Sequence, residues 1–269
     1  MLRTMTTKST FRELHHDLLL LPNAWDAGSA RLFESLGAKA IATTSAGVAW
    51  ARGYPDAGAF PPEPLLATVR EIARVIKVPL SVDIEGGYSD DTANVAQLVT
   101  RVLKAGAVGI NLEDGSGSPE ILCAKIEAAK HAAKSAGADL FINVRTDVYL
   151  RELATGDAAV EEVLRRATLY RAAGGDGIFV PGLADATAME RIAIAIHPTP
   201  LNIMLVPGLP SLEALRKHGV RRLSAGSAIA QAVLGLAGRL ATDFFAGSSE
   251  EIFAAAADYG ATNKLFAID

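Results

Sequence analysis

The feature of this chain that most restricts its fold is an alternation of short apolar runs with longer helix-like segments, repeated eight times along 269 residues. Several runs are nearly continuous in apolar β-formers, as expected of strands buried on both faces of a parallel sheet. Segments rich in Ala, Glu, Lys and Arg separate most of them. Such alternation predicts an α/β protein folded as a (β/α)8 TIM-type barrel. The eight strand-like runs are residues 18–22, 38–44, 78–85, 107–113, 140–145, 177–181, 201–206 and 221–225.

A doubly wound open sheet is the alternative fold. A dinucleotide-binding sheet of that kind carries G-x-G-x-x-G after its first strand, and no such motif follows residues 18–22. No internal linker, low-complexity tract or repeat beyond the βα rhythm divides the chain. We therefore expect one barrel domain over residues 1–269, in which residues 228–269 form a C-terminal helical segment used for oligomerisation.

The C-terminal segment Ala228–Phe245 is apolar on two sides when drawn as a helix. A helix of this kind needs two surfaces to cover it. Its own barrel could cover one side and a second copy of the chain the other, so we expect a homo-oligomer. The two stripes are Ile229, Val233, Leu236, Leu240 and Phe244, and Ala230, Leu234, Ala237, Ala241 and Phe245.

Acidic residues gather at the ends of two neighbouring strand-like runs. Asp83 and Glu85 close one run, and Glu113 closes the next. Residues i and i+2 of a strand point to the same face, so Asp83 and Glu85 should project together. Carboxylate oxygens are the ligands that hard divalent cations prefer. We therefore predict a site for Mg²⁺, with Mn²⁺ as the alternative, held by these three side chains.

Other predicted strand ends carry groups that suit an anionic ligand. Arg145 can hold a carboxylate with two parallel hydrogen bonds. The small polar stretch at Thr44, Ser45 and Ala46 offers backbone N–H groups. With a metal beside them, these groups describe a site for a small oxo- or hydroxy-acid, in which the metal polarises a carbonyl and stabilises an enolate.

Composition excludes several other classes of protein. No basic stripe interleaved with aromatic residues is present, so we expect no nucleic acid partner. No apolar run approaches the ~20 residues that span a membrane, and the single cysteine, Cys123, fits a reducing cytoplasm. We interpret all five histidines as surface residues. Asp26 and Asp114 are interpreted as helix caps rather than ligands.

Six segments together resemble the isocitrate lyase/phosphoenolpyruvate mutase superfamily, and the resemblance covers nearly the whole chain. The segments are LPNAWD at 21–26, AIATTS at 40–45, YPD at 54–56, VDIEGGY at 82–88, GINLED at 109–114 and INVRTD at 142–147.

This resemblance implies a (β/α)8 barrel that binds Mg²⁺ through Asp83 and Glu85. It implies that Glu113, the loop residue Asp56 and the carboxylate-binding Arg145 serve catalysis. The substrate would contact the backbone of Thr44, Ser45 and Ala46, the Arg145 side chain and Asn202. The resemblance also implies that the eighth helix packs on, or is swapped with, a neighbouring subunit in a homodimer or homotetramer.

The chain departs from the best-known members after the fourth strand. Only Gly115, Ser116 and Gly117 separate Glu113-Asp114 from the helix start at Ser118-Pro119. The cysteine-bearing lid of the isocitrate lyases and the longer lid of the mutases have no room there. We therefore predict a divergent member: a Mg²⁺-dependent carbon–carbon lyase acting on a small 2-oxo or 2-hydroxy di- or tricarboxylic acid, by decarboxylation or by retro-aldol cleavage. A phosphonate-processing hydrolase or mutase, or a catalytically silent oxo-acid-binding barrel, are the alternatives.

Overall fold

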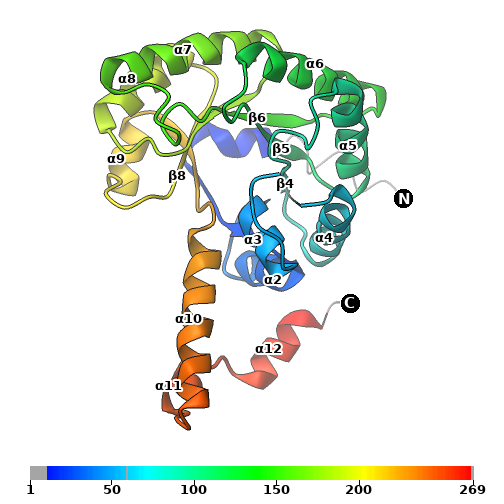
Figure 1. The fold of residues 1–269 in the computed structure, drawn as a ribbon, viewed down its shortest axis with the longest axis vertical. Helices are drawn as coiled ribbons and strands as arrows, with labels where there is room; N and C mark the ends of the chain where they lie inside the picture. The colour runs from blue at the N-terminus through cyan, green and yellow to red at the C-terminus, as the bar shows by residue number, and fades with distance from the viewer. Residues whose placement is uncertain (1–10, 59, 268–269) are drawn as a thin grey trace.

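The computed structural model describes residues 11–58 and 60–267, and its described strands form one closed parallel barrel (Figure 1). The strand order is β1-β9-β8-β7-β6-β5-β4-β3-β2. Pro22 divides the first barrel strand into β1, which pairs with β9, and β2, which pairs with β3. All eight predicted strands are therefore present. Their bounds are β1 Leu19–Leu21, β2 Asn23–Ala24, β3 Ile41–Thr43, β4 Leu80–Asp83, β5 Gly109–Glu113, β6 Phe141–Arg145, β7 Gly177–Val180, β8 Leu201–Met204 and β9 Val220–Ser224.

Helices follow the strands and cover the outside of the barrel. Their starts obey local chemistry: Asp26 caps α2 through a capping box, as predicted, and Ser118 caps α6 with Pro119 in its first turn. The bounds are η1 Leu14–His16, α2 Ala27–Ser35, α3 Ser45–Ala51, α4 Pro62–Val75, α5 Thr92–Lys104, α6 Pro119–Ser135, α7 Gly156–Ala172, α8 Ala186–Ile196, α9 Leu212–Lys217, α10 Ala228–Phe245, α11 Glu250–Ala255 and α12 Tyr259–Phe266.

An aromatic group at the amino end of the barrel corrects one prediction. His15 is buried, not on the surface, because its ring stacks on Phe141 with centroids 4.4 Å apart. Phe11 meets both rings edge-on. Burial lowers the pKa of His15 to about 3, so the ring is neutral. A neutral, stacked histidine fits an apolar aromatic group that closes the amino end of the barrel. Active sites of such barrels lie at the opposite, carboxyl end.

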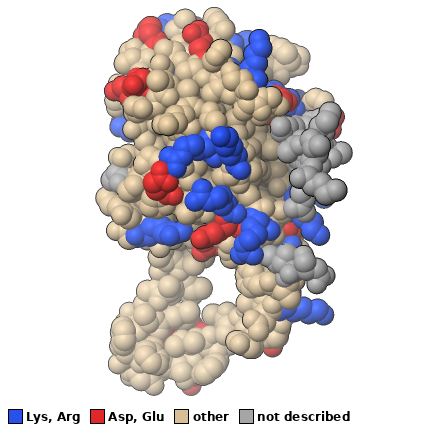
Figure 2. All heavy atoms as spheres, turned by 90° about the vertical axis from the view of Figure 1, so that its right-hand side faces the viewer, with Lys and Arg blue, Asp and Glu red and all other residues tan. Residues whose placement is uncertain are grey.

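Helix α10 extends away from the barrel instead of packing against it, and α11 and α12 follow it in the chain (Figure 1). Of its 18 residues, only Ala230 is buried. The segment 228–267, which we call the arm, returns to the barrel at α12, where Arg31 of α2 donates a hydrogen bond to the Leu265 carbonyl at 3.1 Å. Figure 2 shows an opening between the arm and the barrel, and few charged side chains on this side of the arm. Large apolar side chains are thus left in solvent, with Phe245 84% exposed.

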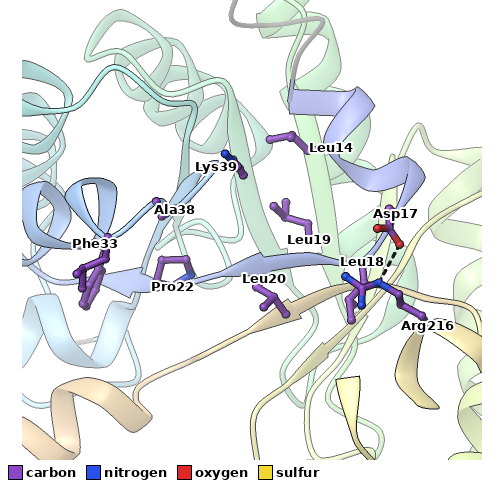
Figure 3. Close-up of a pocket in the computed structure, with 12 residues that line it drawn as sticks. Leu14, Asp17, Leu18, Leu19, Leu20, Pro22, Phe33, Ala38, Lys39 and Arg216 are labelled. Carbon is purple, nitrogen blue, oxygen red and sulfur yellow. Dashed lines mark hydrogen bonds and ion pairs between the residues drawn. The ribbon is translucent and has the colours of Figure 1, made fainter. Parts of the chain in front are cut away.

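A matching apolar groove lies on the outside of the barrel where an eighth helix would pack. Outward-facing residues of β3 to β7 are buried, but Leu20 of β1 is 45% exposed. Leu18, Leu20, Pro22 and Phe33 line a cavity of about 580 Å³ at this place, closed at one end by the Asp17–Arg216 ion pair (Figure 3). The chain therefore has an uncovered groove and an uncovered helix.

By length and composition, α10 could also cross a membrane. The sequence expectation that no run approaches this length was therefore too strict. Arg239 and Asp243 lie inside the helix, and a charge in the bilayer centre is unfavourable by several kcal/mol, roughly 2.5–3.5 on insertion scales. We continue to assign the apolar sides of α10 to a protein contact, as a prediction.

Candidate active site

Asp83 and Glu85 lie at the carboxyl end of β4, but not for the predicted reason. The strand ends at Asp83, and Glu85 stands in the turn that follows, with a left-handed φ of +49°. Its N–H donates to Asp83 Oδ1 at 3.2 Å. A non-glycine residue in this conformation is strained, and such strain concentrates at functional sites. A strained turn, rather than strand alternation, brings the two carboxylates together.

The neighbouring loop after β3 contacts Asp83 from one side. Thr44 caps the short helix α3, and the Ser45 N–H donates to Asp83 Oδ2 at 3.3 Å. The Thr43 hydroxyl accepts from the Asp83 N–H at 2.8 Å. The predicted backbone of Thr44, Ser45 and Ala46 therefore lies beside the predicted metal ligand.

Glu113, Arg145 and Asp147 form a row of ionisable side chains on the other side. Arg145 Nη1 is 2.9 Å from Glu113 Oε2, and Nε and Nη2 of Arg145 donate to the two Asp147 oxygens at 2.6 and 3.1 Å. These contacts use at most three of the five guanidinium N–H donors. Arg145 is thus held in place by two carboxylates and keeps donors for a ligand.

Burial dominates the electrostatics of the acids. Desolvation raises the pKa of Asp83, against the opposing field of Arg145. It also raises the pKa of Glu85, helped by repulsion from Asp83 and Asp56. For Glu113, burial outweighs the nearby Arg145 and, with Asp83 and Asp147, raises the pKa to about 8. Crowded acids of this kind favour a proton or a bound cation.

These shifts predict that the metal-free protein loses stability as pH rises. Between the ordinary glutamate pKa of 4.5 and about 8, folded Glu113 keeps a proton that the unfolded chain releases, so rising pH favours unfolding. The slope is at most about 1.4 kcal/mol per pH unit for this group. Melting in chelator at pH 5.5, 7 and 8.5 should show a decline that Glu113→Gln makes shallower. An equal decline in Glu113→Gln would remove Glu113 as its source.

Asp56 and Tyr88 complete the neighbourhood of Glu85. Asp56 is exposed in the loop before α4, close enough for its charge to raise the Glu85 pKa. The Tyr88 side chain is hydrogen-bonded to Glu85, and burial with the nearby acids raises its pKa far above the ordinary value. Tyr88 is also left-handed, with φ +54°. Both ends of the Glu85–Tyr88 turn are therefore held in uncommon conformations.

Asp114 is neither a ligand nor a helix cap. Its Oδ1 accepts from the Asp147 N–H at 2.9 Å, and its Oδ2 accepts from Arg166 at 2.7 Å and from the Tyr170 hydroxyl at 2.6 Å. The cap prediction was wrong because Arg166 and Tyr170 are supplied by α7, far along the chain. This fully paired carboxylate fixes the backbone that carries Arg145 and Asp147.

The short loop after β5 is fastened by an arginine that sequence reasoning missed. Arg151 donates to Asp147 Oδ2 at 2.9 Å and to the Ser116 hydroxyl at 3.2 Å. Arg145 and Arg151 thus share one buried carboxylate. No local signal marks Arg151, because its partners lie on two different loops.

Asn202 lies in the barrel interior and is 1% exposed. Its Oδ1 accepts from the Ser224 hydroxyl at 3.1 Å. Asn143 donates to Asn111 Oδ1 at 2.9 Å, and the same oxygen accepts from Arg222 at 3.2 Å. These side chains form a polar layer in the barrel interior, and β4–β5 pairing places Asn111 beside Asp83.

The donors fit a magnesium ion only in part as predicted. Across residues 11–58 and 60–267, no three His, Cys, Asp or Glu side chains are grouped so that they could hold a metal ion. Glu113 lies against Arg145 instead. Mg²⁺ usually keeps several waters and binds proteins through one or two carboxylates. Asp83 and Glu85, both buried and unpaired with any Lys or Arg of the described chain, suit that mode. Neither the outer groove around Leu20 nor the cavity near His15 and His218 is lined by any of these residues.

Comparisons with known proteins show the family to which this chain belongs. The family model described as phosphoenolpyruvate phosphomutase matches residues 11–245. The chain belongs to the phosphoenolpyruvate mutase/isocitrate lyase superfamily. An uncharacterised protein of Mycobacterium tuberculosis, Rv1998c, is 37% identical over 221 residues, covering 81% of this chain and 82% of that protein.

Two further relatives are similar to this chain. One is a Burkholderia cenocepacia protein of known structure that carries the provisional description lyase/mutase. Its structure superposes with a TM-score of 0.88 at 32% identity, and the match covers 97% of this chain and 96% of that one. The 2-methylisocitrate lyase of Escherichia coli is 31% identical over 64% of this chain and 60% of its own length. The superfamily thus includes carbon–carbon lyases and phosphonate mutases, and members bind Mg²⁺.

Proposed function

We propose that this protein is a Mg²⁺-dependent lyase that breaks a carbon–carbon bond in a small 2-oxo or 2-hydroxy di- or tricarboxylic acid. The observation that carries the proposal is the pair of buried carboxylates, Asp83 and Glu85, next to the firmly held Arg145. Relatives such as 2-methylisocitrate lyase support the reaction class. The enzyme is proposed to act in the cytoplasm as a homodimer or homotetramer.

In this mechanism the chain's residues bind and orient the acid. Asp83 and Glu85 hold the metal, and Arg145 donates its remaining N–H groups to a substrate carboxylate. When bound, Mg²⁺ supplies Lewis acidity that stabilises an enolate. The backbone at Thr44, Ser45 and Ala46 borders the same space, and Asp56 approaches Glu85 from the facing loop.

Glu113 is the proposed proton-transfer group. Burial and the nearby acids raise the pKa of Glu113 in the metal-free protein. A raised pKa suits the proposed role, in which Glu113 protonates an enolate carbon and then accepts a proton in return. This assignment replaces the lid acid for which the loop of Gly115, Ser116 and Gly117 leaves no room. Decarboxylation needs this acid only after CO₂ has left, whereas retro-aldol cleavage also needs a base at the hydroxyl. Both reactions stay within the proposal.

A product assay tests the reaction. Purified protein with Mg²⁺ is incubated with a panel of 2-oxo and 2-hydroxy di- and tricarboxylates, and products are followed by ¹³C NMR. We expect CO₂ or a pair of cleaved acids from at least one member, and none in excess chelator. Release of phosphate or isomerisation with phosphonopyruvate would instead support the phosphonate alternative. Tight binding without turnover of any of these acids or of phosphonopyruvate would support a catalytically silent barrel and refute the lyase proposal.

Replacing Arg145 tests the carboxylate grip. Arg145→Lys keeps the charge but loses the planar fork, so kcat/KM should fall at least ~10-fold. Steady-state kinetics on the accepted acid provide the measurement. Arg165→Lys, on an exposed pair with Glu162 of α7, is the matched control and should stay close to wild type. Unchanged kinetics in Arg145→Lys would make Arg145 purely a structural partner of Glu113 and Asp147.

A further inference from the structure

The barrel interior contains an arginine that the proposed mechanism does not use. Arg222, in the middle of β9, is 0% exposed. Arg222 and Ser224 point into the barrel, whereas Val220 pairs with Leu201 and packs in the outer core. Arg221, the extra residue of a β-bulge against β8, and Leu223 are half-buried on the outside. Nε of Arg222 donates to the Ser224 hydroxyl at 3.3 Å, and Nη2 donates to Asn111 Oδ1 at 3.2 Å. Its hydrogen-bond partners are neutral.

Two buried donors in this layer lack an acceptor. Within residues 11–58 and 60–267, Arg222 Nη1 and Asn202 Nδ2 make no hydrogen bond, and no carboxylate forms an ion pair with Arg222. The two residues are register partners on adjacent strands and are linked through the Ser224 hydroxyl. The charge of Asp83 attracts Arg222 but forms no ion pair with it. A buried guanidinium without an ion pair, next to a second unpaired donor, is unfavourable. An anionic oxygen would satisfy both donors.

The position of this layer relates it to the acids. Asn111, which contacts Arg222, is the strand-pairing partner of Asp83. The amino end is closed by Phe11, His15 and Phe141. An anion reaching Arg222 therefore enters from the carboxyl end of the barrel, past Asp83.

We propose that Arg222 and Asn202 form an oxyanion-binding site that receives one carboxylate of a dicarboxylate substrate. The inference rests on the proposed function and narrows the substrate class to dicarboxylates. Arg145 would bind one carboxylate at the carboxyl end of the barrel, and Arg222 would bind the other in the barrel interior. An acid with one carboxylate leaves one of the two arginines unmatched. The site thus selects dicarboxylates by charge count and by guanidinium geometry.

Oxalate, a small dianion, is the probe. Its dissociation constant is measured by calorimetry with Mg²⁺ for wild type and for Arg222→Met, Arg222→Lys and Arg221→Met. We expect Arg222→Met to raise the dissociation constant of oxalate at least tenfold and Arg222→Lys to raise it several-fold. Arg221→Met removes the same side chain from the outward face of the same strand and should stay within twofold. Mn²⁺ affinity, measured by electron paramagnetic resonance, should not weaken in Arg222→Met, since a nearby positive charge is lost.

Asn202→Asp keeps the inference testable if Arg222→Met does not fold. This variant supplies Arg222 with an internal carboxylate. It should therefore raise the melting temperature and weaken oxalate binding at least tenfold. Wild-type oxalate affinity in folded Arg222→Met, or in Asn202→Asp, would overturn the site. If the variants lose oxalate binding but the wild type cleaves no acid, the lyase proposal is refuted and the oxyanion site is retained. Cleavage with unchanged kinetics in Arg222→Met would refute the site alone.

Discussion

Asp83→Asn should lose at least ~10³-fold in kcat/KM, about 4 kcal/mol of transition-state stabilisation, while the barrel stays folded. The amide keeps an oxygen that can accept from the Ser45 or Glu85 N–H groups, but it removes the charge that holds the metal. Because Asp83 raises the pKa of both Glu85 and Glu113, its neutralisation should also relieve repulsion. The metal-free variant should therefore melt no lower than wild type.

The matched control removes a carboxylate elsewhere. Asp157 is 88% exposed and pairs with Arg191, so Asp157→Asn should stay within about twofold in rate, as is usual for exposed ion pairs. Activity is measured across a Mg²⁺ titration for both variants. Full activity of Asp83→Asn at any Mg²⁺ concentration would refute the assignment of Asp83 as a metal ligand.

Leu234→Asp and Phe245→Asp should break the assembly. Leu234 is 55% exposed and Phe245 84% exposed on the arm, whereas the groove around Leu20 lacks a cover. Each side chain buried is worth ~1.5–3 kcal/mol. In a two-fold symmetric contact each change counts twice, so the dimer dissociation constant should rise by roughly 10²–10⁴. Sedimentation or light scattering across micromolar concentrations measures this.

The groove gives an independent test of the same contact. Leu20→Asp changes the barrel face without touching the arm, and it should dissociate the assembly as Leu234→Asp does. Ser248→Asp adds the same charge in the turn after α10 and should leave the assembly intact. A monodisperse wild-type monomer would refute the prediction. Dissociation by the arm variants with an intact Leu20→Asp assembly would place the contact elsewhere.

The barrel could be predicted from sequence because its strands are buried on both faces, so apolar runs such as 140–145 mark them directly. The candidate site residues were predicted at strand ends for the same reason. The Asp83–Glu85 pair was predicted from an incorrect premise: alternation places i and i+2 together in a strand, but the strand ends at Asp83. Only the backbone reveals the left-handed turn at Glu85.

Long-range partners account for what sequence reasoning missed. Asp114 resembled a cap because the residues that pair with it, Arg166 and Tyr170, lie 52 and 56 positions further on. Arg222 did leave a signal, since two adjacent arginines on a barrel strand must point to opposite faces and one of them must therefore be inward. The pattern could not decide which arginine that is. His15 was misjudged because its burial depends on stacking with Phe141, from a distant strand.

A crystal structure of the protein grown with Mg²⁺ and oxalate tests the central claim most directly. We predict one metal ion bound by Asp83 and Glu85, with oxalate beside it and in contact with Arg145. Metal bound elsewhere, oxalate confined to the amino end of the barrel, or an empty carboxyl end at saturating concentrations of both would contradict the assignment of this site.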